Sequence, residues 1–269
     1  MDPTPLWVTG CAVLLAACAG PAVAPHPTQY EEETFELDSF RWRGDISGSR
    51  LVTATNAWGD LRTRTSDRGT EDLIVSAMIQ KIGTKRDEFE IRIEPATEAV
   101  AVTVVPIVAE PRGRVDLTLL IPPGRRLEGT TLDGLAELKY KGDVAARTRG
   151  GRIVVRTPAH AQASSESGDI IAQLSAGGWR DPVSLTSDSG GVTVLLPADS
   201  NLVLRASSPG TIELDFPPRA TADVLREGER LEATLGAGGS ELRVRSGFGP
   251  LRILPLAGRS PAGHNAADA

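Results

Sequence analysis

A short pattern of glycine and alternating apolar residues recurs along the chain. It consists of a glycine, any residue, an apolar residue, any residue and, in most copies, a second apolar residue. The glycines that begin it are Gly59, Gly113, Gly134, Gly142, Gly151, Gly168, Gly190, Gly210 and Gly249. Glycine readily adopts the positive φ of a tight turn, and alternating apolar residues bury one face of a strand. The pattern therefore predicts a turn followed by a half-buried strand, repeated as a stacking unit.

Three other segments carry a secondary-structure signal. Residues 89–93 and 100–104 alternate apolar and polar or small positions, as do residues 115–121, and each segment predicts a strand. The apolar residues between Leu73 and Ile82 fit either a short helix or a strand, because their spacing allows one and their β-branched members favour the other. Each repeat is too short to contain a helical crossover. The expected fold class is therefore all-β: a repetitive β-solenoid or β-helix-like stack of short strands in one elongated domain.

Composition agrees with an aliphatic stack of this kind. The 269 residues are 40% hydrophobic but only 4% aromatic, and they include 28 Gly and 19 Pro, which suit short strands joined by many turns. The net charge is −6, with acidic and basic residues interspersed and no run of basic residues along the sequence. We therefore expect no nucleic-acid partner.

The N-terminal segment has the composition of an export signal. Residues 6–17 form an apolar run that is shorter than the ~20 residues needed to cross a bilayer. The run ends in Leu15-Ala16-Ala17-Cys18, which resembles the lipobox of bacterial lipoproteins. In a lipobox, small residues precede the cleavage site and the cysteine thiol carries the lipid. The resemblance predicts lipid attachment at Cys18.

This interpretation divides the chain into four parts. They are a lipoprotein signal peptide at 1–17, a Pro- and Glu-rich tether at 18–34, a β-repeat domain at 35–256 and a disordered tail at 257–269. Cys11 is removed with the signal, so Cys18 is the only cysteine of the mature chain and no disulfide is expected. The apolar run is preceded by Asp2 and by no Lys or Arg, unlike most signal peptides. A plain secreted protein and a cytosolic protein with an apolar start are the alternatives.

Longer motifs occur in a fixed order within the repeats. A strand ends in Ile121-Pro122, and later turns have the form Thr/Ser-x-x-Gly-x-apolar, beginning at Thr148, Ser165, Ser187 and Ser207, with a second apolar-Pro pair at Leu196-Pro197. This order resembles the bacterial putative-adhesin domain family of unknown function, which is related to auto-transporter head domains of the GIN type. The resemblance covers roughly residues 51–216. It implies an all-β, solenoid-like stack at the cell envelope and supplies no catalytic residues. The alternation at Leu231, Ala233 and Leu235 has no leading glycine and departs from the family pattern.

Candidate chemistry is sparse. Asp60, Asp143 and Asp169 each follow a repeat glycine, so stacking could align them as a carboxylate column that raises their pKa values or holds Ca²⁺. The simpler interpretation is that each aspartate accepts hydrogen bonds from turn amides. The three histidines have no partner at metal-ligand spacing, so we expect no metal site, no cofactor and no catalytic residue. Arg43-Gly44-Asp45 matches an integrin-binding tripeptide that three common residues also produce by chance.

These patterns favour a non-catalytic lipoprotein of the cell envelope. We expect a lipid anchor in the membrane (the outer membrane in a Gram-negative cell), with the domain facing the periplasm or the cell surface. Its β-repeat surface would serve adhesion or binding to a glycan, a protein or another copy of itself. The alternative is a carbohydrate-active β-helix enzyme of the polysaccharide lyase or hydrolase type, which would use aspartates in a deep groove.

Overall fold

The fold is seen in a computed structural model that describes residues 35–83, 86–175, 177–216 and 221–256, with the backbone alone at 221–223. In these residues the chain forms 21 strands and no helix, so no helix there could span a membrane. The all-β, repetitive fold class predicted from the sequence is confirmed. The predicted signal peptide, Cys18, the tether and the tail lie outside the described residues.

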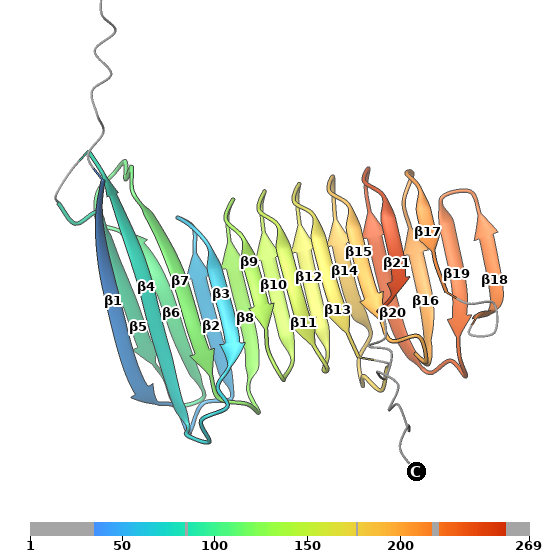
Figure 1. Ribbon diagram of the computed structural model, residues 1–269, viewed down its shortest axis with the longest axis horizontal. Helices are drawn as coiled ribbons and strands as arrows, with labels where there is room; N and C mark the ends of the chain where they lie inside the picture. The colour runs from blue at the N-terminus through green and yellow to red at the C-terminus, as the bar shows by residue number, and fades with distance from the viewer. Residues whose placement is uncertain (1–34, 84–85, 176, 217–220, 257–269) are drawn as a thin grey trace, which may run out of the picture. The chain divides into compact units, whose positions relative to one another are not determined.

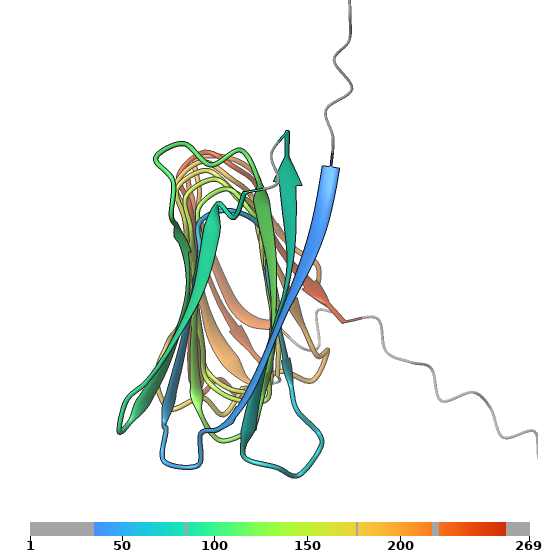
Figure 2. The same ribbon diagram turned by 90° about the vertical axis from the view of Figure 1, so that its left-hand side faces the viewer.

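The strands form two sheets that face each other (Figures 1 and 2). Sheet A contains, in spatial order, β1 (Phe35–Asp45), β4 (Asp72–Ile82), β7 (Arg114–Ile121), β3 (Leu61–Thr65), β9 (Ala136–Lys139), β11 (Ile153–Thr157), β13 (Ile170–Leu174), β15 (Val192–Leu196), β21 (Leu251–Pro255) and β17 (Ile212–Leu214). Sheet B contains β18 (Thr221–Glu227), β19 (Arg230–Leu235), β16 (Leu202–Ser207), β20 (Ser240–Ser246), β14 (Val183–Ser187), β12 (Ala161–Ser165), β10 (Val144–Thr148), β8 (Arg126–Thr131), β2 (Leu51–Asn56), β6 (Ala99–Pro106) and β5 (Phe89–Pro95).

One rung of the stack is a strand of sheet B, a corner, and the next strand of sheet A. In the centre, successive rungs pair in parallel and in register, so that Ile153 lies beside Ile170 in sheet A and Val144 beside Ala161 in sheet B. The repeat glycines that precede strands of sheet A lie at these corners. The spacing of these glycines, which excludes Gly142 before β10 of sheet B, is therefore the period of the rungs.

The core is a column of aliphatic side chains between the two sheets. Ile153, Val155 and Ile170 are fully buried, as are Val192 and Val194, as the alternating pattern predicts. Ile212 and Leu214, predicted to face inward as well, are only half-buried. The reason is that β17 is the last strand of sheet A and has a neighbour on one side only.

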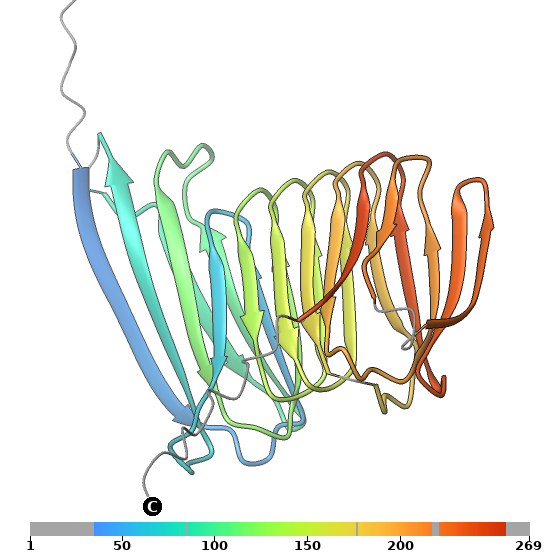
Figure 3. The same cartoon turned by 45° about the vertical axis from the view of Figure 1, so that its right-hand side comes forward.

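The rungs at both ends of the stack are out of sequence order. The rung β2–β3 lies between the rungs β6–β7 and β8–β9, although it precedes both in the chain. At the other end, β20–β21 lies between β14–β15 and β16–β17. Figures 1 and 3 show this as a red pair of strands within the orange ones.

Antiparallel strands complete both ends. The segment at Leu73–Ile82, which the sequence left open between helix and strand, is within strand β4 and pairs with β1 and β7. The alternating residues 231–235, which lack a leading glycine, belong to β19 and pair antiparallel with β16 and β18. These segments depart from the repeat because they close the stack and do not form rungs.

Candidate functional site

Six of the nine repeat glycines form a column along one corner of the stack. A Cβ atom on Gly134 would overlap the carbonyl oxygen of Gly59, and one on Gly151 would overlap that of Gly134. The same relationship continues through Gly168, Gly190 and Gly249, in the spatial order of the rungs. None of these glycines has a positive φ. The explanation from tight-turn φ angles was therefore wrong: glycine is required because adjacent rungs approach closely.

A ladder of buried polar side chains runs beside the glycine column. Ser187 Oγ accepts a hydrogen bond from the amide of Gly190 at 2.9 Å and donates one to the carbonyl of Gly168, also at 2.9 Å. Ser246 Oγ likewise donates to the carbonyl of Gly190 in the next rung. Other rungs place Asn56, Thr131, Thr148, Ser165 and Ser208 at this corner. The Thr/Ser-x-x-Gly motif is therefore a structural element of this corner at Thr148, Ser165 and Ser187. In the copy expected at Ser207, the hydroxyl at the corner is that of Ser208, which accepts the amide of Gly210 and donates to the carbonyl of Gly249.

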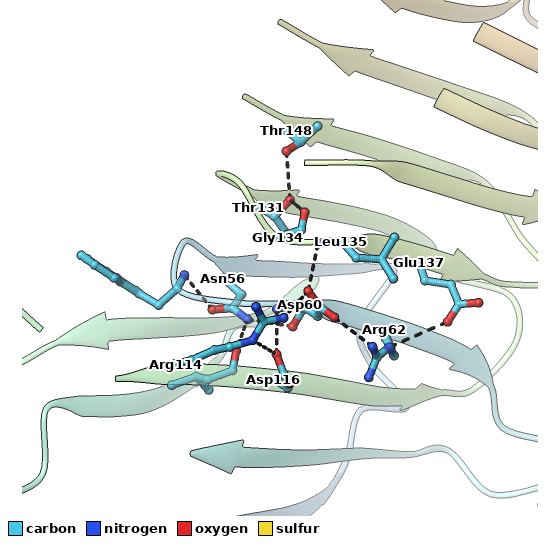
Figure 4. Close-up of polar contacts among 12 residues, drawn as sticks. Asn56, Asp60, Arg62, Arg114, Asp116, Thr131, Gly134, Leu135, Glu137 and Thr148 are labelled. Carbon is cyan, nitrogen blue, oxygen red and sulfur yellow. Dashed lines mark hydrogen bonds and ion pairs between the residues drawn. The ribbon is translucent and has the colours of Figure 1, made fainter. Parts of the chain in front are cut away.

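Asp60, one of the three candidate aspartates, lies in an ionic network at this corner (Figure 4). Its carboxylate accepts hydrogen bonds from Arg62 at 2.8 Å, from Arg114 at 2.5 Å and from the amide of Leu135 at 3.0 Å. Asp116 shares Arg114 with Asp60 and accepts the amide of Asp60 at 3.1 Å. The side chain of Asp60 is only 12% exposed. Sequence reasoning did not find Asp116, whose proximity depends on the pairing of β3 with β7.

The three aspartates do not form one cluster. Asp169 follows a glycine of the same column as Asp60, but Leu135 and Arg152 occupy the corresponding positions in the two rungs between them. Asp143 precedes β10 of sheet B and therefore lies at a different corner. Asp169 Oδ1 accepts the amide of Gly191 at 2.9 Å, and Asp143 Oδ1 accepts that of His160 at 3.2 Å. Each of the three aspartates thus bonds to a backbone amide of the next rung, as the simpler interpretation expected.

Two other candidate residues, Arg43 and His160, lie close to groups of neighbouring strands or turns. Arg43 lies in strand β1 and bonds to Asp72 across the pair with β4, and this contact lowers the pKa of Asp72. His160 Nε2 lies 3.0 Å from the carbonyl oxygen of Pro182. Within the described residues, no three His, Cys, Asp or Glu side chains are grouped to hold a metal ion. His26 and His264 lie outside those residues, so the expected absence of a metal site remains a prediction.

No family model matches the chain, and no curated protein matches it by sequence. Its fold is similar to that of a putative cell adhesion protein from Clostridium sporogenes, with 12% identity over 82% of this chain and 100% of that chain and a TM-score of 0.46. A putative adhesin from Bacteroides fragilis (8% identity, 81% and 97% covered, TM-score 0.32) and one from Parabacteroides distasonis (9%, 82% and 97%, 0.33) are also similar. Putative adhesins are thus the chain's structural neighbours.

The outer faces of the sheets carry the polar surface of the domain. On sheet A, a hollow of about 480 Å³ is lined by Arg64, Lys139 and Arg156, which are neighbours across β3, β9 and β11. Lys139 forms an ion pair with Glu137, and this contact lowers the pKa of Glu137. On sheet B, two hollows of about 370 and 350 Å³ share Thr186 as a lining residue. All three hollows lie on open sheet surfaces.

Proposed function

We propose that this protein is a non-catalytic lipoprotein of the cell envelope, which presents its β-repeat surface for adhesion or binding. Cys18 would carry the lipid, and residues 18–34 would hold the domain away from the membrane. Its ligand would be an envelope glycan, a protein or another copy of the chain.

The observation that carries this proposal is the role of the candidate aspartates. Asp60, Asp143 and Asp169 each accept a backbone amide from the neighbouring rung. Most glycoside hydrolases use a pair of carboxylates that flank the scissile glycosidic bond. Here the close pair, Asp60 and Asp116, is bridged by Arg114, whose guanidinium group forms an ion pair with each carboxylate. The arrangement supports a structural function for these aspartates.

The outer surfaces support binding over an extended area. Their hollows are shallow features of sheet faces, and they are lined mainly by arginine and hydroxyl side chains. An enzyme or small-molecule site is usually a concave, mostly apolar pocket. Polar contacts spread over a face are weak individually and gain strength when many copies share one membrane.

Catalysis and binding can be separated in one experiment. The purified protein, incubated with envelope polysaccharides with and without Ca²⁺, should release no reducing ends and no unsaturated products. It should be retained on cell-wall material, and this retention should be lost after unfolding. Glycan turnover that disappears in Asp60→Asn, Asp143→Asn or Asp169→Asn with the fold intact would replace this proposal with the carbohydrate-active enzyme.

The anchor has its own test. Expressed in a bacterium supplied with a labelled fatty acid, the protein should take up label and sediment with membranes. Cys18→Ala should abolish the labelling and release the protein from that fraction. A soluble wild-type protein that retains Asp2 would exclude export and the lipid anchor together.

A further inference from the structure

A single row of outward side chains crosses seven strands of sheet B. We call it the outer arginine row, and it consists of Thr130, Arg147, Ser164, Thr186, Arg245, Ser207 and Arg230. Each member is the in-register neighbour of the next, on strands β8, β10, β12, β14, β20, β16 and β19. The row contains three guanidinium groups, four hydroxyl groups and no carboxylate.

The three arginines of the row are exposed and available. Among the described residues, Arg147, Arg230 and Arg245 have no ion-pair or hydrogen-bond partner for their guanidinium groups. The adjacent arginines on the same face differ, since Arg205 and Arg243 both contact Glu241. Arg147 and Arg245 are thus uncompensated in one line, whereas Arg230, at the end of the row, has Glu227 of β18 as its in-register neighbour.

The two hollows on sheet B lie along this row. Thr130, Arg147, Ser164 and Thr186 line one hollow, and Thr186, Ser207, Arg230 and Arg245 line the other. The acids at these hollows are Glu166 and Asp188 near the corner and Glu232, which lies 3.8 Å from Arg205. A ligand following the row would therefore meet arginines and hydroxyls first.

The spacing of the row suits a linear polymer. Adjacent strands are about 4.8 Å apart, which places Arg147 roughly 14 Å from Arg245 and Arg245 roughly 10 Å from Arg230 along the row. A sugar in a linear polysaccharide advances by about the same length as one strand spacing. Carboxylates carried on successive sugars could thus reach guanidinium groups that are two or three strands apart.

We infer that the outer arginine row binds a linear anionic polysaccharide that lies across the strands of sheet B. Guanidinium groups form paired hydrogen bonds with carboxylates, and the Ser and Thr hydroxyls between them can bond to sugar hydroxyls. Single-stranded nucleic acid fits less well, because the row contains no aromatic side chain on which bases could stack. This inference rests on the proposed binding function and assigns to it a face and a ligand class.

The test uses the full chain in detergent micelles and polygalacturonate oligomers as the probe. Arg147→Gln combined with Arg245→Gln should weaken binding roughly tenfold, since each exposed ionic contact contributes modestly. The matched control is Arg64→Gln with Arg156→Gln, which removes the same charge from sheet A and should change affinity less than twofold. All proteins should have the same melting temperature, because the four residues are exposed.

Three further measurements define the ligand. Affinity should fall as salt rises from 25 to 150 mM, because salt screens exposed charges. It should rise with oligomer length until the oligomer spans the row, roughly 29 Å for six strand spacings, and then level off. Neutral dextran should not bind.

Several results would overturn the inference. They are no binding of polygalacturonate, equal losses in both double variants, binding of dextran at similar strength, or tighter binding of single-stranded DNA through the same arginines. If the Arg147/Arg245 variant is retained on cell-wall material as well as the wild type, the outer arginine row is not the binding surface, but the proposed binding function still holds. If the wild-type protein is not retained on cell-wall material at all, the proposed binding function is wrong.

Discussion

A Cβ atom added to Gly168 would overlap the carbonyl oxygen of Gly151 in the neighbouring rung. The two residues lie at the same position of successive corners, and adjacent rungs repeat the relationship along the column. Because the obstacle is backbone, it cannot move away as a flexible side chain would. The contact therefore explains why glycine recurs at this position even though its φ is not positive.

The first prediction concerns this close approach. Gly168→Ala should destabilise the protein by about 3 kcal/mol, because the added methyl group forces two rungs apart in a well-packed stack. Chemical denaturation followed by circular dichroism gives the free energy of unfolding. Gly48→Ala is the control, since Gly48 lies in an exposed turn with ordinary space for a Cβ. Equal changes in the free energy of unfolding for the two substitutions would contradict the close approach of rungs at the glycine column.

The second prediction concerns the polar ladder. Ser187→Ala should cost about 1–3 kcal/mol, because it leaves the amide of Gly190 and the carbonyl of Gly168 without their buried partner. Ser164→Ala, on the exposed side of β12, should stay within about 0.5 kcal/mol. If Ser187→Ala is as mild as the control, water has replaced the hydroxyl and the ladder contributes little.

The third prediction concerns the core. Ile153→Asp should destabilise by about 3 kcal/mol or more, because it places an unpaired carboxylate at a fully buried position. The adjacent Arg152 is exposed at a corner, and Arg152→Ala should change stability by less than about 0.5 kcal/mol. The melting temperatures of the two variants distinguish these effects. If Ile153→Asp is as stable as the wild type, the side chain of Ile153 does not point into the core.

The fourth prediction concerns acid. The hydrogen bond from Lys139 holds the pKa of Glu137 below its ordinary value of 4.5, although partial burial opposes the shift. The unfolded chain therefore takes up this proton first, and the stabilisation present above pH 4.5 is lost as the pH falls toward the folded pKa. Melting temperatures of wild type and Glu137→Gln should differ at pH 7, and the difference should shrink as the pH falls below 4.5. A difference in melting temperature that does not change with pH would exclude a contribution of ionised Glu137 to stability.

Local pattern predicted the rungs well. The Thr148–Gly151 and Ser165–Gly168 motifs mark corners, and the buried set around Ile153 follows from alternation along single strands. The physical reason for the glycines could not be found in the same way. It depends on which carbonyl lies above each glycine, and that is a contact between rungs.

Other features depend on register between distant segments. Asp60 and Asp143 both follow glycine, yet they lie at different corners because Gly59 precedes a strand of sheet A and Gly142 a strand of sheet B. Arg147 and Arg245 share a row only because β20 pairs beside β14, more than fifty residues earlier in the chain. The repeat pattern in the sequence does not indicate that β20 lies between β14 and β16.

The out-of-order rungs also determine where this molecule can change length. Both ends are interlocked, because β20 separates β16 from β14 and β2 separates β6 from β8. A unit added or lost at either end would disturb an insertion. The rungs from β8 to β15 follow each other in order, and Gly134, Gly151 and Gly168 are spaced 17 residues apart. Removing residues 151–167 would join Gly150 to Gly168 and shorten the domain by one strand spacing, about 4.8 Å, with both caps unchanged. The centre is thus an adjustable spacer, and evolution or design can set the reach of this domain there in steps of one rung.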